Sequence, residues 1–523
     1  WLKPLVAPGV SQLGVGSAME FSEQIYLLLL LLSALTLLLL LLLLLRLGSL
    51  RIFKSVGRAL ELVALFLPLL PLLVAARLAD WLNGKGDRLE AWWKLCLRRL
   101  QQSGPVLVKL GQWAATRKDL LPEGVCKQLG RLHSTAESHG IDHTHAVLAR
   151  SFCEEGQSHW SKRLLLEPEP VGSGCIAQVY LGYLLPERSA RPEPSCFPWL
   201  RPRKQGSEAV PARRVAVKVV HPHVRWSVDM DLGLLAFFAA IFERLGLDHL
   251  GVSLALRQFA AFLEAQTDLT IEAENLRTLR RHFSDMGGKV AIPEVFDAFV
   301  SHDALVMGFE DGEPLSTLLE SGDRSLQLDA WRTLVDSFWA MVFRYRFVHG
   351  DLHPGNILWR RQGDRVQLVL LDCGLTINLG GEAGEDLSKM VKAFLTKSEE
   401  EVATLLVDLS ERVGGRPEDV VDKPGFVRGI SDLIRQGKAC NFQLNRLNAG
   451  ALMGRSLILG RRHRVRFDAR FVNLMVAMVV VQGVAMTLNG GGEIVSRMHP
   501  FLFGAVAREG IKALRGRGKV AQS

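Results

Sequence analysis

Residues 347–358 read Phe-Val-His-Gly-Asp-Leu-His-Pro-Gly-Asn-Ile-Leu, and residues 368–374 read Leu-Val-Leu-Leu-Asp-Cys-Gly. Asp351 is followed five residues later by Asn356, and a hydrophobic strand then ends at Asp372. The Pro-Gly pair forces a tight turn, so the first two side chains can face one cleft. The first aspartate can orient or deprotonate an attacking hydroxyl, while the amide and the second carboxylate are hard oxygen ligands for Mg²⁺ on nucleotide phosphates. This stretch predicts a phosphoryl-transfer site.

The chain has 523 residues, 48% of them apolar, and a formal net charge of +9. This length has room for roughly two to four domains. The charge suits an anionic membrane surface or a nucleotide, and without interleaved basic and aromatic residues we expect no nucleic-acid partner. Seven scattered cysteines without a Cys-x-x-Cys pair argue against a disulfide scaffold or zinc site and favour a reducing compartment. The sequence begins at Trp1, and we expect a segment upstream of it, such as an organelle presequence.

Residues 27–45 are almost entirely leucine. At 1.5 Å per residue, about 19 residues cross a hydrocarbon core of about 30 Å. We therefore predict one transmembrane helix over residues 26–46, after a leader over residues 1–25; an uncleaved signal sequence is the alternative. Acidic residues precede this segment and basic residues follow it: Glu20 and Glu23, then Arg46, Arg51, Lys54 and Arg58. The positive-inside rule places the C-terminal bulk in the cytosol or the mitochondrial matrix.

A juxtamembrane helical segment is predicted over residues 47–99. Its most apolar part, residues 59–76, contains one acid and two prolines: Glu61, Pro68 and Pro71. A helix lying on the membrane, or a re-entrant pair, fits these interruptions better than a second span. Residues 471–488 are also apolar but carry Asn473, Gln482 and Gly483, which favours a buried helix.

Strand patterns begin near residue 164. Residues 170–182 read as a strand, a glycine-bearing turn and a strand, and such a turn can bring backbone N–H groups onto phosphates. The Val-rich strand 214–220 contains Lys218. An unpaired lysine in a buried strand is costly, so we expect a carboxylate partner. Glu272, in the helical segment 253–283, is the candidate.

Other elements follow from the same reading. The Pro- and Arg-rich residues 186–214 predict an exposed hairpin insertion. Short strands are predicted at 290–292 and 304–306, and helices at 226–245, 329–345, 384–413 and 426–436.

A helix is predicted to start at Ser103-Gly-Pro105, with a capping hydroxyl and a proline in its first turn. Lys109 and Gln112 lie three residues apart, so they share one face of this helix. With these residues the chain resembles the UbiB/aarF-domain-containing atypical kinases, because Lys109-x-Gly-Gln112 looks like that family's signature motif. The His-Gly-Asp-x-His-Pro-Gly-Asn stretch alone also resembles small-molecule phosphotransferases.

The resemblance implies an α+β, bilobal protein-kinase-like fold with an N-terminal helical extension. The extension would cover residues 100–163, the N-lobe 164–310 and the C-lobe 311–523. Asp351 would be the catalytic aspartate, Lys218 the phosphate-gripping lysine and Glu272 its helix partner. Asn356 and Asp372 would hold Mg²⁺. The residues implied to bind ATP or ADP are Val171, Gly172, Ser173, Gly174, Cys175, Ile176, Ala177, Gln178, Val179 and Lys218, with Lys109 and Gln112 folded over the site.

The resemblance also implies a biological setting. Members of that family support ubiquinone biosynthesis or related prenyl-lipid metabolism, and show ATPase more readily than protein-kinase behaviour. We accordingly expect a single-pass protein of the mitochondrial inner membrane with its catalytic domain facing the matrix. Expected partners are membrane lipid, quinone or prenyl-lipid precursors, and ubiquinone-biosynthesis proteins.

Two departures from the family pattern stand out. Gly172-Ser173-Gly174 replaces an alanine-rich loop that is thought to restrain phosphorylation, and Gln266-x-Asp268 replaces a Glu-x-Asp pair, which removes one carboxylate expected for Lys109. Two alternatives therefore stay open: a conventional protein or small-molecule kinase, and a non-catalytic scaffold in which nucleotide reshapes a lipid-binding surface.

Overall fold

A computed structural model describes most of the chain in twelve segments: residues 50–83, 87–116, 121–132, 138–152, 160–186, 212–222, 224–244, 252–412, 418, 420–439, 449–489 and 496–504. The chain falls into two compact units, the first drawn from residues 1–111 and 226–257 and the second from residues 112–225 and 258–523. The predicted transmembrane helix over residues 26–46 and most of the predicted insertion over residues 186–214 lie outside the described residues.

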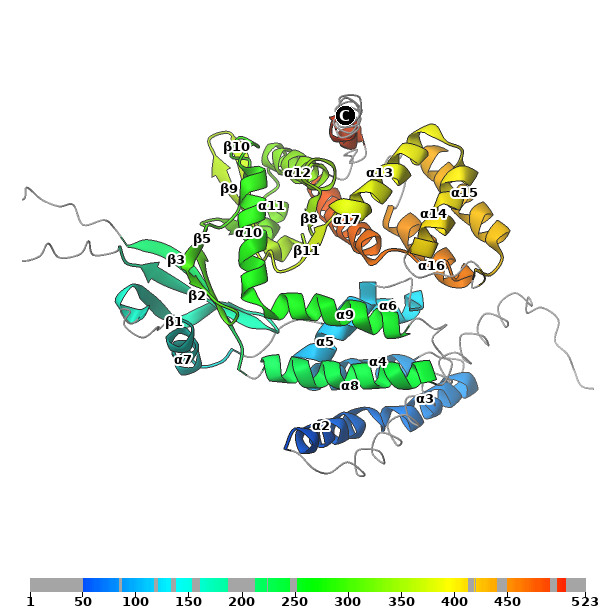
Figure 1. Ribbon diagram of the computed structural model, residues 1–523, viewed down its shortest axis with the longest axis horizontal. Coiled ribbons are helices and arrows are strands. Elements are labelled where there is room, and N and C mark those ends of the chain that lie inside the picture. The colour runs from blue at the N-terminus through cyan, green and yellow to red at the C-terminus, as the bar shows by residue number, and fades with distance from the viewer. Residues whose placement is uncertain are drawn as a thin grey trace, which may run out of the picture. The chain divides into compact units, whose positions relative to one another are not determined.

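The first unit is helical (Figure 1). Its helices are α2 (Leu50–Phe66), α3 (Leu69–Asn83), α4 (Asp87–Gln102) and most of α8 (Val224–Arg244), and α5 (Pro105–Thr116) begins in it. Trp92 packs on Leu69 and Leu73, and its ring N–H donates to the Leu69 carbonyl at 2.8 Å. A half-buried ion pair between Arg58 and Asp231, 2.8 Å apart, joins α2 to α8. The helix expected at Pro105 is confirmed.

In the second unit, a five-stranded antiparallel sheet has the order β1-β2-β3-β6-β5. Its strands are β1 (Leu164–Ser173), β2 (Ala177–Leu184), β3 (Arg213–Val220), β5 (Val295–Val300) and β6 (Ala304–Gly308). On β3, Val215, Val217 and Val219 are fully buried and pack with Val147 and Leu148 of α7 (Ile141–Phe152). Because side chains alternate along a strand, Lys218 points to the opposite face of the sheet.

The helix predicted over residues 253–283 is in fact two helices, α9 (Val252–Thr267) and α10 (Leu269–Phe283). They divide at Asp268, whose backbone is extended and whose side chain accepts a hydrogen bond from the Thr270 N–H. A carboxylate in this position stabilises the start of a new helix more than the continuation of the old one. The prediction was wrong here because the apolar periodicity continues across the break.

The rest of the second unit is mostly helical, with two small sheets of order β4-β10-β9-β7 and β11-β8. The strands are β4 (Val290–Ala291), β7 (Glu313–Pro314), β8 (Phe347–His349), β9 (Ile357–Gln362), β10 (Arg365–Leu370) and β11 (Thr376–Asn378). The α-helices are α6 (Glu123–Leu129), α11 (Leu315–Glu320), α12 (Arg324–Trp339), α13 (Gly381–Thr396), α14 (Glu399–Arg412), α15 (Lys423–Ala439), α16 (Ala449–His463) and α17 (Ala469–Leu488). Three short 3₁₀-helices are η1 (Trp160–Lys162), η4 (Pro354–Asn356) and η6 (Ser496–Met498), and η3 (Ala340–Tyr345) is a π-helix that continues α12.

The segment 384–413, predicted as one helical stretch, divides into α13 and α14 at Ser398. Glu401 accepts from the Ser398 N–H at 3.1 Å, and the Glu401 N–H donates to the Ser398 hydroxyl at 3.2 Å. This reciprocal capping box fixes the start of α14.

α17 has the length and hydropathy of a membrane span, but half of its most apolar window is buried, and Val472, Ala477 and Val481 are almost fully enclosed.

Candidate functional site

The centre of the candidate site is a lysine held between two carboxylates. The Lys218 Nζ atom of β3 lies 2.9 and 2.7 Å from the two carboxylate oxygens of Glu272 in α10, and 3.1 Å from Asp372 Oδ1 after β10. The Glu272 side chain is 3% exposed and that of Lys218 12%, whereas Asp372 is about half exposed. The predicted Lys218–Glu272 pair is therefore present, and its open side carries Asp372.

Burial and charge act against each other at this pair. Burial alone would lower the pKa of Lys218, but the carboxylates of Asp372 and Glu272 outweigh it and raise the pKa well above its ordinary value. Burial raises the pKa of Glu272, and the Lys218 ammonium opposes that shift. An ammonium with three donors and two anionic neighbours stays charged, so Lys218 can contribute a fixed positive charge to a phosphate.

The turn between β5 and β6 holds both partners of this ion pair. The Asp303 carbonyl accepts from the Val220 N–H at 3.0 Å, two residues after Lys218. The neighbouring His302 carbonyl accepts from the Leu269 N–H at 3.1 Å, three residues before Glu272. The end of β3 and the start of α10 are thus fixed to adjacent backbone groups, which sets the separation of the two side chains.

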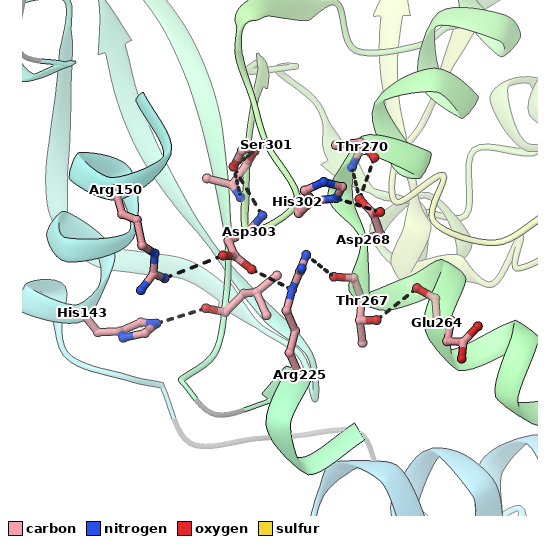
Figure 2. Close-up of polar contacts among 12 residues, drawn as sticks. His143, Arg150, Arg225, Glu264, Thr267, Asp268, Thr270, Ser301, His302 and Asp303 are labelled. Atoms are coloured by element: carbon pink, nitrogen blue, oxygen red, sulfur yellow. Dashed lines mark hydrogen bonds and ion pairs between the residues drawn. The ribbon is translucent and has the colours of Figure 1, made fainter. Parts of the chain in front are cut away.

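Side chains reinforce the same turn (Figure 2). Arg150 and Arg225 point toward Asp303 from two sides, with N–O distances of 3.6 and 2.8 Å. His302 lies 2.9 Å from Asp268, the residue that caps α10. Burial alone would raise the pKa of Asp268, but hydrogen bonds from Thr270 and His302 outweigh it and lower the pKa. These contacts around His302 and Asp303 could not be predicted from the sequence, because the Ser-His-Asp run of residues 301–303 has no helical or strand periodicity.

Asp351 and Asn356 are brought together as predicted. The Asn356 amide nitrogen donates to the Asp351 carbonyl at 3.0 Å and lies 3.5 Å from its carboxylate. The buried His349 accepts from the Asp351 N–H at its Nδ1 atom, 3.1 Å away, and its Nε2 atom lies 3.0 Å from the Leu371 carbonyl. Burial lowers the pKa of His349, so the neutral ring can accept at one nitrogen and donate at the other.

The loop carrying Asp372 is fastened to the loop carrying Asp351. The Leu371 N–H donates to the Asn356 carbonyl at 2.8 Å, and the antiparallel pair Ile357–Leu370 places Asn356 and Asp372 at the same end of the β9–β10 ladder. Asp372 has a φ of +47°. A non-glycine residue in the left-handed region costs of order 1–3 kcal/mol and is typical of functional sites.

These donors suit magnesium. In the described part of the chain, no group of three or more His, Cys, Asp or Glu side chains could hold a metal ion by itself. Mg²⁺, however, is usually bound by one or two protein oxygens together with substrate phosphates and water. The side-chain hydrogen bonds of Asn356 to Asp351 use its amide nitrogen. The amide oxygen of Asn356 could therefore bind Mg²⁺ together with the Asp372 carboxylate.

The predicted glycine-bearing turn is a β1–β2 hairpin closed by the Gly174 N–H donating to Ala177 O at 3.0 Å. Val171, Gly172 and Gly174 are exposed, Ser173 and Val179 are half-buried, and the side chains of residues 175–178 are buried. The Gln178 amide bonds to the His139 backbone in both directions, at 2.9 and 3.0 Å. Any contact of residues 175–178 with a nucleotide would therefore use their backbone.

A chain of histidines supports this turn. His221, after β3, has its Nε2 atom 2.8 Å from the Gly174 carbonyl, and its Nδ1 atom 2.7 Å from His139 Nδ1. His139 Nε2 lies 2.9 Å from the Thr144 hydroxyl. When His221 donates to Gly174, its Nδ1 atom accepts from His139, and both rings are neutral. Burial, followed by repulsion from His221 and His143, lowers the pKa of His139 to about 4.

The remaining predicted residues, Lys109 and Gln112, fall on either side of the position in the sequence where the first unit ends and the second begins. Lys109 is half-buried on α5 and belongs to the first unit, whereas Gln112 belongs to the second. The Gln112 amide nitrogen lies 3.5 Å from the Leu132 carbonyl. The lid role of both residues stays a prediction.

One further contact of the site was not predicted. The Asn275 side-chain amide donates to the Cys373 carbonyl at 2.9 Å. The sequence signal available for it was that Asn275 lies three residues after Glu272, on the same side of the helix.

The sequence is similar to known proteins. The sequence model of the ABC1 atypical kinase-like domain matches residues 208–406. ABC1 family protein C21C3.03, mitochondrial, of Schizosaccharomyces pombe is 25% identical over 511 residues, covering 88% of this chain and 72% of that protein. ABC1 family protein YPL109C, mitochondrial, of Saccharomyces cerevisiae is 25% identical over 507 residues, covering 86% and 74%.

A third relative, the probable serine/threonine-protein kinase abkC of Dictyostelium discoideum, is 23% identical over 479 residues, covering 79% of this chain and 65% of that protein. Among solved structures, the Rv3197–erythromycin complex from Mycobacterium tuberculosis is 17% identical with a TM-score of 0.43, covering 79% of this chain and 94% of that chain. The predicted mixed α+β, kinase-like fold is confirmed. Residues 208–406 match the ABC1 atypical kinase-like domain, and most of the chain is similar to mitochondrial ABC1 family proteins of two yeasts.

Proposed function

We propose that this protein is a membrane-anchored atypical kinase that binds ATP with Mg²⁺ and hydrolyses it or transfers its terminal phosphoryl group. The observation that carries the proposal is the position of Lys218 within 3.1 Å of both Glu272 and Asp372, whose loop is bonded to Asn356 through Leu371, while Asn356 is in turn bonded to Asp351. Lysine, aspartate and asparagine in these positions are the groups that grip phosphates, orient a nucleophile and hold the metal in phosphoryl transfer.

Each residue has a distinct role in the proposed reaction. Lys218 would move from Asp372 toward the nucleotide phosphates while Glu272 keeps its ammonium in place. Asp351 would orient the attacking water or hydroxyl, and His349 would hold the backbone of Asp351 through the bond at 3.1 Å. Asn356 and Asp372 would hold Mg²⁺, which supplies neutralisation of the phosphate charge when bound.

Turnover of ATP by the full-length protein in detergent tests the proposal. We expect Mg²⁺-dependent release of ADP, and we expect Asp372→Asn to lower it by at least about 100-fold, because a preorganised charge contact in a transition state is worth about that much. Asp364→Asn, in the turn between β9 and β10, is the matched control and should leave turnover unchanged. Equal turnover by the wild type and Asp372→Asn would refute the enzymatic proposal.

The fate of the phosphate separates the open alternatives. Labelled phosphate that appears on a defined acceptor, and vanishes in Asp351→Asn, would indicate a conventional kinase. Release as inorganic phosphate would indicate an ATPase, and tight binding without turnover would indicate a scaffold.

The names of the two yeast relatives support a mitochondrial location. We further propose a role in ubiquinone or related prenyl-lipid metabolism, which quinone levels in cells lacking the protein would test.

A further inference from the structure

An apolar stripe runs along the exposed side of α2 and α3, which follow one another end to end in Figure 1. Residues 55–82 have a mean hydropathy of 2.3 over their most apolar window, and only 17% of that window is buried. The large exposed side chains in this segment are Leu60, Leu67, Leu72, Val74, Leu78, Trp81 and Leu82. Within α3, residues 74, 78 and 81 are spaced by four and three residues, which puts them on one side of the helix, with Leu82 beside Leu78.

The opposite side of α3 makes the internal contacts of the first unit. Leu69 and Leu73 are each 5% exposed and pack on Trp92 of α4. Asp80 also faces α4, where its carboxylate accepts from the N–H groups of Arg88 at 3.0 Å and Leu89 at 2.8 Å. The inner side of α3 therefore carries a carboxylate, while its outer side exposes 56% of Leu78, 79% of Trp81 and 67% of Leu82.

This arrangement reverses the usual polarity of a surface helix, which turns its charged side to solvent. Scattered exposed apolar residues need no explanation, but a run of seven exposed large apolar side chains that includes a tryptophan indicates an interaction surface. Pro68 separates α2 from α3, but exposed apolar residues lie on both sides of it.

The sequence around this surface identifies its partner. Four residues separate the leucine run of residues 27–45 from the start of α2 at Leu50. Residues 46–49 reach at most about 14 Å when extended. A bilayer crossed by the leucine run would therefore lie within that distance of the start of α2. Trp81 suits the same setting, because tryptophan concentrates at the boundary between lipid chains and water.

We propose that α2 and α3 lie in the membrane interface, with the stripe from Leu60 to Leu82 inserted among the lipid acyl chains. This contact is additional to the proposed transmembrane anchor and rests on it. Interfacial helices of this kind bury their apolar side by about 5–10 Å in the boundary between headgroups and chains. The first unit would then be held at the bilayer along the length of α2 and α3 and not only at one point.

The test uses the full-length protein in vesicles of phosphatidylcholine, phosphatidylethanolamine and cardiolipin. An environment-sensitive fluorophore is attached through Leu78→Cys or, in a second variant, Leu82→Cys, and the signal of the labelled unsubstituted chain is subtracted. Lys94→Cys, on the exposed side of α4, is the control. We expect blue-shifted emission at positions 78 and 82 and several-fold stronger quenching by lipids spin-labelled in their acyl chains than at position 94.

Two results would overturn the proposal. Emission at positions 78 and 82 like that at position 94 would show that the stripe faces water. Blue-shifted emission that spin-labelled lipid does not quench would show that protein, either another copy or residues 1–49, covers it. ATP turnover by the same vesicles and their co-flotation with the protein report on the catalytic and anchoring proposals separately.

Discussion

Lys218 is the residue on which the site depends, because it occupies a buried strand and contacts two acids. A buried ammonium without a partner would cost several kcal/mol, so its retention in a Val-rich strand indicates a role. The lysine within the Val-rich strand 214–220 predicted that Lys218 has a function and a carboxylate partner. Glu272 was identified as that partner. The resemblance placed Asp372 in the same site, but its direct contact with Lys218 at 3.1 Å has no local signal, because the two residues are 154 positions apart.

The Glu272 carboxylate should be necessary for nucleotide binding. Glu272→Gln keeps the shape of the side chain but removes the charge, so we expect Lys218 to lean toward Asp372 and ATP affinity to fall at least about tenfold, or about 1.4 kcal/mol. Glu274→Gln is the control, because that exposed acid pairs with Arg277 at 3.2 Å on the solvent side of α10. Titration calorimetry measures both; equal affinities for the two variants would contradict the proposed role.

His139 should make stability depend on pH. Its pKa is lowered to about 4 in the folded protein from an ordinary value of 6.5. As the pH falls from 6.5 to 4, the unfolded chain takes up this proton first, so stability is full above about pH 6.5 and declines through that interval. Other buried histidines shift in the same direction, including His221 and His349. His139→Gln should therefore flatten the curve partly, as measured by urea unfolding at several pH values, and an unchanged slope would contradict this account.

At the scale of elements, the position of α10 is set by the contacts of its first turn: Asp268 caps the helix, and the Leu269 N–H donates to the His302 carbonyl. Apolar periodicity predicted one helix over residues 253–283 and did not predict its division at Asp268. The division depends on a single hydrogen bond from the Thr270 N–H to the Asp268 carboxylate, and a hydropathy pattern contains no information about such a bond. The division matters for the site. It lets α10 start at the β5–β6 turn, which also holds the end of β3, so that Glu272 meets Lys218.

Removal of the α10 cap should affect both stability and nucleotide binding. Asp268→Ala should lower the free energy of unfolding by about 1 kcal/mol, as loss of an N-cap usually does. We also expect it to weaken ATP binding, because the α10 start and its Glu272 become less fixed. Asp323→Ala removes the corresponding cap of α12, which accepts from Ser325 and Leu326, and should cost similar stability but leave ATP affinity unchanged. Urea midpoints and calorimetry on both variants decide; equal loss of affinity would contradict the positioning role.

At the scale of the whole molecule, the α+β kinase-like fold was predicted from the family resemblance, and the local spacing of Asp351, Asn356 and Asp372 predicted that these three residues share one site. The sequence did not indicate that residues 226–257 belong with the N-terminal helices in the first unit. That association depends on long-range packing such as the Arg58–Asp231 pair, whose members are 173 residues apart. Periodicity carries no information about such pairs.

The family resemblance predicts that the α5 region closes over bound nucleotide. Amide hydrogen exchange with and without Mg²⁺–ADP tests this at the level of the whole chain. We expect slower exchange at residues 105–112 together with residues 347–376, and unchanged exchange in α15 and α16, which serve as an internal control. Protection of residues 347–376 without any change at residues 105–112 would contradict the lid role of Lys109 and Gln112.

We propose that the side chains of Lys218, Asp351, Asn356 and Asp372 together form one Mg²⁺–nucleotide site. Its most direct test is the affinity of the full-length protein for ATP with Mg²⁺ and with EDTA, measured for the wild type, Lys218→Met and Asp372→Asn. We predict that the wild type binds at least about tenfold more tightly with Mg²⁺, that Asp372→Asn loses this dependence on Mg²⁺, and that Lys218→Met weakens binding in both conditions. Equal affinities for all three proteins, with no effect of Mg²⁺, would contradict the account.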